Sequence, residues 1–235
     1  MNGPDLRQDT GRPLDRLVRD PALRSAIGYW DSLRDGRIVP PRMALDPAEM
    51  RPVLQQAAIL ENTRPGSVRI RLAGARISAL MGMEVRGMPL RALFDLADRG
   101  RITTEVERAL EEPAALMLDV EAPAPRHGVG PALRTQIALL PMSDVEFMIN
   151  RALYVMGDVG GAEPGAPQPD TPYRWSLRHV ERVPLRIGQP MLAVQPVRSA
   201  PKEGATVPVA GDEAASEACG PMARARFRVI DGGLA

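Results

Sequence analysis

The sequence predicts an α+β fold in which helices cover a five-stranded antiparallel sheet. Three observations support this prediction. Five segments are rich in apolar residues and have the alternation that is typical of strands. Short loops join neighbouring strands, which favours antiparallel pairing. Short helices stand between the second and third strands, and one longer helix flanks the sheet on its N-terminal side.

The flanking helix is predicted over residues 21–34. Asp20 is suited to cap its first turn, and Pro21 is suited to its first position. Its apolar residues recur at helical spacing and form one stripe: Leu23, Ile27, Trp30 and Leu33. This stripe needs a partner surface, which is either the chain's own sheet or the same helix of a second copy in a homodimer.

The predicted strands cover residues 55–62, 68–75, 115–122, 132–140 and 150–159. The Pro65-Gly66 pair between the first two suits the centre of a type II turn. In the second strand Val68, Ile70 and Leu72 alternate with arginines, so we expect one buried and one solvated face.

Three helices are predicted between the second and third strands. Residues 76–81 form a short helix that Gly82 ends in a left-handed conformation, and residues 89–96 form another. The clearest of the three covers residues 100–112, because apolar residues line one of its faces before Pro113.

Composition and charge narrow the class of protein. The chain has 235 residues, 44% of them hydrophobic, and a formal net charge of +1. A single cysteine, Cys219, fits a reducing compartment. The sequence has no run of eighteen apolar residues, the length that would predict a membrane-spanning helix. We therefore expect a cytoplasmic protein with a flexible segment 1–19, one domain over 20–160 and a mostly disordered Pro/Gly/Ala-rich extension over 161–235.

One long segment carries a family resemblance. Its pattern comprises Trp30, Leu33-Arg34, Pro40, Arg42, Asp46-Pro47, Arg71-Leu72-Ala73-Gly74, Gly82 and Gly87. With the order of elements, this pattern resembles a PAS-like family of alphaproteobacteria, known as PAS domain-containing proteins of unknown function. The resemblance covers roughly residues 20 to 160. It implies a sensory or interaction module with a small pocket between the sheet and the helices.

A pocket of this kind would be lined by apolar side chains. The candidates follow from predicted face and topology: Leu72, Leu80, Leu93, Phe94, Val106, Leu118 and Ile137. Adaptable methionines fall in or beside the same region: Met81, Met83, Met88, Met117, Met148 and Met156. A plain packed core and an adaptable ligand cavity are both consistent with this pattern.

The sequence carries no sign of catalysis, of a cofactor or of a metal site. Residues 75–96 lack the cysteine of flavin-binding photosensory PAS domains, and residues 76–112 lack the histidine that usually binds haem in others. His127 and His179 are expected to be solvated. No catalytic motif is present, so we expect no enzyme activity. With eight aromatic residues and near-neutral charge, the chain is also not expected to bind nucleic acid.

A segment over residues 173–187 combines apolar and basic residues. Its arginines recur every fourth residue, which predicts a short docking helix whose contact residues are Arg174, Trp175, Arg178 and Arg182. This helix would recruit a partner protein or an anionic surface, or would pack back onto its own domain.

Two functional hypotheses follow. In the first, a sensory module binds a small apolar or amphipathic ligand and signals through contact with a regulatory protein. In the second, a ligand-free adaptor with a filled core binds a regulatory protein through the sheet face or the C-terminal segment.

Overall fold

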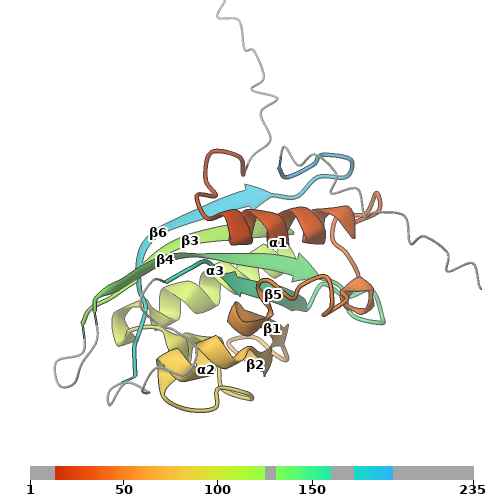
Figure 1. Cartoon of the computed structure of the whole chain (residues 1–235). Helices are drawn as coiled ribbons and strands as arrows, with labels where there is room; N and C mark the ends of the chain where they lie inside the picture. The colour runs from red at the N-terminus through yellow and green to blue at the C-terminus, as the bar shows by residue number, and fades with distance from the viewer. Residues whose placement is uncertain (1–13, 125–130, 160–171, 193–235) are drawn as a thin grey trace, which may run out of the picture. The chain divides into compact units, whose positions relative to one another are not determined.

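The computed structural model describes residues 14–124, 131–159 and 172–192, and all of them belong to one compact unit that ends at Pro196 (Figure 1). A single antiparallel sheet forms the centre of this unit, with strand order β2-β1-β5-β4-β3-β6. Its strands are β1 (Ala57–Asn62), β2 (Val68–Ala73), β3 (Ala114–Ala122), β4 (Leu133–Met142), β5 (Arg151–Met156) and β6 (Ser176–Pro184). The α+β fold and its five predicted strands are confirmed, and the sixth strand was not predicted.

The predicted helices are also present. They are α1 (Pro21–Ser32), α2 (Ala75–Met81) and α3 (Arg99–Glu111), with short 3-10 turns η1 (Arg42–Ala44), η2 (Leu54–Gln56), η3 (Leu90–Leu93) and η4 (Leu96–Asp98). The Asp20 carboxylate accepts a hydrogen bond of 2.8 Å from the backbone N–H of Leu23 and so caps α1. Gly82 ends α2 at a φ of 64°, a conformation that glycine adopts without steric cost.

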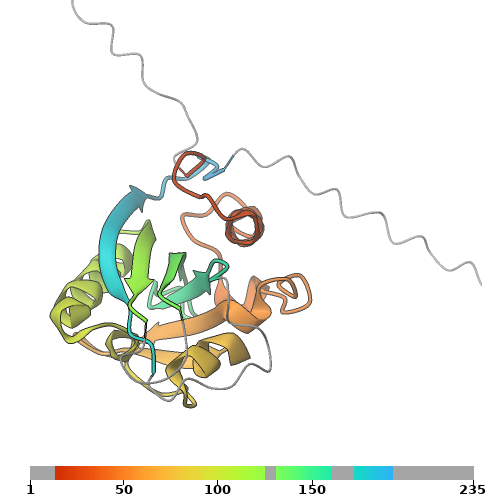
Figure 2. The ribbon, with the colours of Figure 1, turned by 60° about the vertical axis from the view of Figure 1, so that its left-hand side comes forward.

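The sheet has an apolar cluster on each face. We call the face covered by α2, η3 and α3 the inner face, and the face covered by α1 the outer face. Figure 2 shows α1 end-on, across the sheet from α3. Because both faces are covered, β3, β4 and β5 are buried along almost their whole length.

The prediction of a docking helix over residues 173–187 is wrong. Most of this segment forms β6, which pairs with β3 along its length. A spacing of four residues fits one face of a helix, but it also fits one side of a strand, whose period is two. The strand β6 lies beyond residues 20–160, the range predicted for the domain. Leu14 and Val18, at 0% and 3% exposure, also pack in the outer cluster.

Leu72 departs from the predicted alternation of the second strand. The register of β1 and β2 shifts between Ile59 and Leu60, so that Ile59 faces Leu72 while Leu60 faces Ile70. This β-bulge turns Leu72 to the outer face, where it is 48% exposed. The prediction that Leu72 shares a buried face with Val68 and Ile70 is therefore wrong.

The apolar stripe of α1 packs on its own sheet. Leu23, Ile27 and Trp30 are all 0% exposed, and Trp30 Nε1 donates a 3.1 Å hydrogen bond to the carbonyl oxygen of Pro141 in β4. The same stripe is therefore not available to a second copy, and the homodimer predicted through the apolar stripe of residues 21–34 is not supported by this packing.

Arg34 fastens the segment after β6 over α1. The side chain is 4% exposed, and its guanidinium lies 5.8 Å from the centre of the Trp30 ring. It pairs with Asp31 at 2.9 Å and donates hydrogen bonds to the carbonyl oxygens of Gln189 and Arg186. The buried charge of Arg34 is therefore fully paired, and the Arg34 side chain covers the outer cluster near the end of α1.

Candidate functional site

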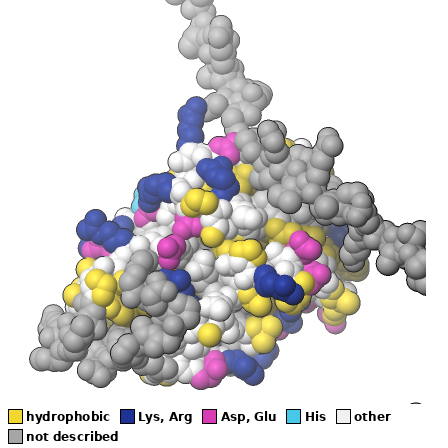
Figure 3. All heavy atoms as spheres, viewed as in Figure 1, with side chains coloured by type: hydrophobic (Ala, Val, Ile, Leu, Met, Phe, Trp, Pro, Cys, Tyr) yellow, Lys and Arg dark blue, Asp and Glu magenta, His cyan; other side chains and the backbone are white. Residues whose placement is uncertain are grey.

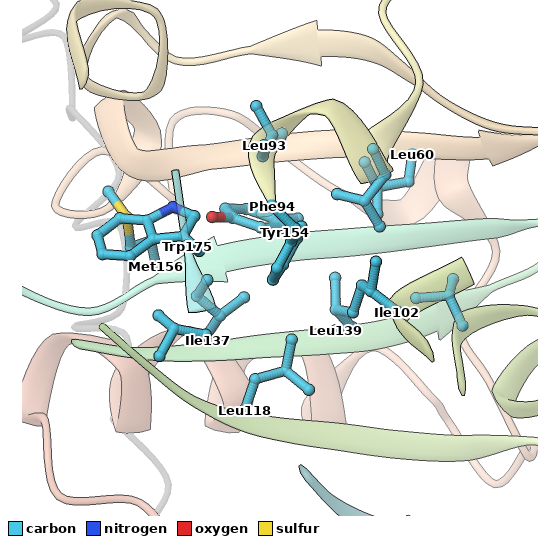
Figure 4. Packing of buried hydrophobic residues seen from close by; sticks show 14 of the residues in the cluster. Leu60, Leu93, Phe94, Ile102, Leu118, Ile137, Leu139, Tyr154, Met156 and Trp175 are labelled. Carbon is cyan, nitrogen blue, oxygen red and sulfur yellow. The ribbon is translucent and has the colours of Figure 1, made fainter. Parts of the chain in front are cut away.

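The inner cluster contains most of the residues predicted to line a pocket. Six of the seven candidates are buried there, each at most 3% exposed: Leu80, Leu93, Phe94, Val106, Leu118 and Ile137. Figure 4 shows four of them around Tyr154, which extends from β5 into the cluster. Leu72 lies on the other face of the sheet.

Tyr154 is the unusual member of this cluster. It is 1% exposed, and its hydroxyl has no hydrogen-bond partner among the residues that the structure describes. In Figure 4 the hydroxyl points towards Trp175. A tyrosine hydroxyl is protonated at neutral pH and can donate as well as accept a hydrogen bond, and burial raises the pKa of the Tyr154 hydroxyl further.

Backbone pairing positions both aromatic residues, Tyr154 and Trp175. Tyr154 lies in β5 between Ala58 of β1 and Leu139 of β4. The backbone N–H of Trp175 donates to the carbonyl oxygen of Leu93 at 2.9 Å, and that of Asp95 donates to Trp175 at the same distance. At 1% exposure, Trp175 is a core residue that covers the inner face, not the exposed contact residue of the docking prediction.

The three arginines of the docking prediction also have partners within the fold. Arg178 pairs with Glu121 of β3, and Arg182 pairs with Glu112 at 2.7 Å. The hydrogen bond and the charge of Arg182 hold the pKa of Glu112 below its usual range. Arg174 donates to the carbonyl oxygen of Tyr173 at 3.0 Å and lies 3.2 Å from the sulfur of Met81.

The methionines predicted for the core are divided between several environments. Met81 and Met156 lie within the inner cluster, and Met88 packs against it. Met117 faces the outer cluster. The remaining two, Met83 and Met148, are 44% and 61% exposed.

A small apolar hollow opens on the outer face beside the bulge. Its volume is about 160 Å³. The bulky side chains around it are Leu45, Met50, Leu54, Ile59, Leu72 and Leu153. Arg42 is the charged residue of its lining, and neither an ion pair nor a side-chain hydrogen bond of Arg42 is present within the described part of the chain.

A larger hollow of about 640 Å³, with many charged side chains in its lining, lies where α1 begins, beside the end of β3 and the start of β4. Its charged groups neutralise one another, because Asp119 pairs with Arg19 and Glu121 pairs with both Arg134 and Arg178. Figure 3 shows the same mixture of basic and acidic side chains across one face of the molecule. We therefore assign no ligand to this hollow.

The described residues offer no cluster of three metal-binding side chains. His179 is exposed and lies 3.3 Å from Glu181, while His127 and Cys219 are outside the described ranges. Among the helices of residues 14–124, 131–159 and 172–192, none has the length and apolar character that a membrane crossing requires.

Two features of these sites were not found from the sequence. Tyr154 was part of a predicted strand, but nothing in the sequence indicates that its hydroxyl lacks a partner. Arg42 was named only as part of the family resemblance, together with Pro47 and Gly74, which also line the apolar hollow. These residues thus surround one surface feature, which the family pattern alone does not reveal.

Comparison with known proteins agrees with this architecture. None of the curated proteins matches the chain significantly. The family model described as PAS domain matches residues 18–156, which is more than half of the chain and spans α1 to the end of β5. Proteins with this domain are in general sensory or regulatory modules. The order of strands and helices, the covered inner face and this match together show that the chain belongs to the PAS domain family.

Proposed function

We propose that the chain is a non-catalytic sensory module that binds a small apolar or amphipathic ligand on the inner face of its sheet. The ligand site would centre on the Tyr154 hydroxyl and include the six buried candidates of the inner cluster. Ligand binding would be passed on through contact with a regulatory protein.

The unpartnered hydroxyl of Tyr154 is the observation that carries this proposal. A buried hydroxyl without a hydrogen bond costs about 1–3 kcal/mol in stability. A ligand with one polar atom and an apolar body would bond this hydroxyl and also bury apolar surface in the cluster. The hydroxyl would then select ligands by their polar atom, since an analogue without that atom leaves Tyr154 unpaired.

Room for a ligand would come from adaptable side chains. Met81 and Met156 both belong to the inner cluster, and methionine changes rotamer at low cost because its side chain is unbranched. Met81 also lies at the end of α2, next to Gly82. A ligand in contact with Met81 would therefore also lie against the end of α2, which gives a route from the ligand site to the surface of the protein.

Native mass spectrometry of gently purified protein, combined with thermal unfolding over a panel of metabolites, tests the proposal. We expect an added mass on the full chain, or a rise in Tm with an amphipathic metabolite, and loss of this effect in Tyr154→Phe. Phe147→Tyr is the matched control, because Phe147 is 77% exposed and the change leaves the inner face intact. The bare polypeptide mass together with no thermal shift would refute the proposal.

A second candidate is an adaptor that acts without a ligand. It is supported by the tight burial of the inner cluster and by the open apolar hollow on the outer face. The same experiment separates the two candidates, since an adaptor gives neither added mass nor a thermal shift and yet still binds its partner protein.

A further inference from the structure

We propose that the apolar hollow of the outer face, between residues 42–54 and the end of β2, is a docking site for a partner protein. It would take one bulky apolar side chain of the partner, and an aspartate or glutamate next to that side chain would pair with Arg42. This surface is separate from the ligand site, because the two lie on opposite faces of the sheet.

The size of the hollow suits a side chain better than a free small molecule. Its volume of about 160 Å³ is well below the roughly 300–1,000 Å³ of typical small-molecule sites. Leu54 and Leu72 line it and are 44% and 48% exposed, so two bulky apolar side chains stay in contact with solvent. A partner side chain placed between them would bury apolar surface that the fold itself leaves open.

The wall of the hollow is held in place. The backbone N–H of Arg42 donates to the carbonyl oxygen of Ser143 at 2.8 Å, which ties this segment to the loop after β4. On the other side, a Cβ atom added to Gly74 would lie 2.2 Å from the carbonyl oxygen of Gln55. Because the backbone is packed this closely, the hollow is preformed, and little order has to be gained on binding.

The charge of Arg42 indicates which kind of residue the partner presents beside its apolar side chain. Arg42 is half-buried at the hollow, and no carboxylate within the described residues pairs with it. Asp46 is in the same segment, but its carboxylate accepts a 2.8 Å hydrogen bond from the backbone of Ala48, and Glu49 is exposed outside the lining. A partly desolvated guanidinium next to an apolar hollow complements an acidic residue beside an apolar one.

The test is selection from a random library of short peptides displayed on phage, with the full chain as bait. We expect enrichment of peptides in which Leu, Ile or Phe stands beside Asp or Glu. Synthesised peptides should lose affinity by about tenfold or more with Leu72→Asp or Leu54→Ser. Arg42→Glu should weaken the binding of these peptides and strengthen the binding of versions in which lysine replaces the acidic residue. Leu96→Asp and Arg64→Glu, both at exposed positions elsewhere, are the matched controls.

Several results would overturn the proposal. Selected peptides without the apolar-acidic pair, peptides that bind the variants as well as the wild type, or no enrichment at all would each do so. A dimer in light scattering that Leu72→Asp dissociates would assign the hollow to a second copy. A bound small molecule that Leu72→Asp removes in native mass spectrometry would assign it to a ligand. Tyr154→Phe should leave peptide binding unchanged, so this proposal and the proposed sensory function fail independently.

Discussion

The two faces of the sheet are covered in different ways. On the inner face, α2, η3, α3 and Trp175 bury an apolar cluster in which the Tyr154 hydroxyl has no hydrogen-bond partner among the described residues. On the outer face, α1 and the segment after β6 cover most of the sheet but leave the hollow at Leu72 open. A ligand would therefore have to enter by displacing side chains, whereas a protein partner can bind without displacing any. This difference is what suggests sensing on one face and docking on the other.

The largest expected effect is that of Trp175→Ala. Loss of a buried tryptophan from the inner cluster should lower the free energy of unfolding by about 3–5 kcal/mol. Phe147→Ala removes an aromatic ring that is 77% exposed, and it should change stability by about 0.5 kcal/mol or less. Urea denaturation followed by circular dichroism measures both. Equal stabilities of the two variants would mean that Trp175 does not close the inner face.

A smaller difference in the free energy of unfolding is expected between alanine variants of two residues of β2. Ile70→Ala empties a site on the inner face and should cost about 2–5 kcal/mol, while Leu72→Ala, at a half-exposed site on the outer face, should cost about 1 kcal/mol or less. The β-bulge is the reason for this difference. If the two variants are destabilised to the same degree, the register shift between Ile59 and Leu60 is wrong.

Tyr154→Phe should stabilise the ligand-free protein, by about 1 kcal/mol, because it removes a buried hydroxyl that has no partner among the described residues. Most substitutions in a core destabilise, so the sign of the effect is informative. Chemical denaturation of protein that has been unfolded and refolded to remove any bound molecule gives this value. A clear loss of stability would show that the hydroxyl already has a partner in the folded chain.

The smallest effect concerns the contact between β6 and the end of α3. Arg182→Gln should raise the pKa of Glu112 towards its usual value, because the side-chain hydrogen bond and the charge of Arg182 are what lower it. The ion pair stabilises the fold above the usual pKa of Glu112, and this contribution is lost as the pH falls through the lowered value. NMR titration of the Glu112 carboxyl measures the shift. Arg108→Gln is the control and should change the pKa less, since Arg108 lies 4.0 Å from the carboxylate.

Local signals explain why most of the fold was predictable. The Asp20 cap, the glycine that ends α2 and the Pro65-Gly66 turn each depend on neighbouring residues alone. The β6 strand was missed because a four-residue spacing of arginines fits both a helix and a strand, and only pairing with β3 decides between them.

The sites were harder to predict because they depend on contacts between distant segments. The bulge that exposes Leu72 is a property of the pairing of β1 with β2, and it changes the face of a residue without any change in pattern. That the Tyr154 hydroxyl and the Arg42 guanidinium lack partners among the described residues follows from the tertiary contacts, which the sequence pattern does not contain. Six of the seven predicted pocket residues nevertheless lie together in the inner cluster, since their apolar character and predicted faces followed from periodicity.

A crystal structure of the full chain, purified without denaturation, tests the sensory function most directly. We predict electron density for a non-protein molecule on the inner face, with a polar atom within hydrogen-bond distance of the Tyr154 hydroxyl and with Met81 or Met156 displaced. An inner cluster filled by side chains alone, or a single water molecule at the hydroxyl, would contradict the account.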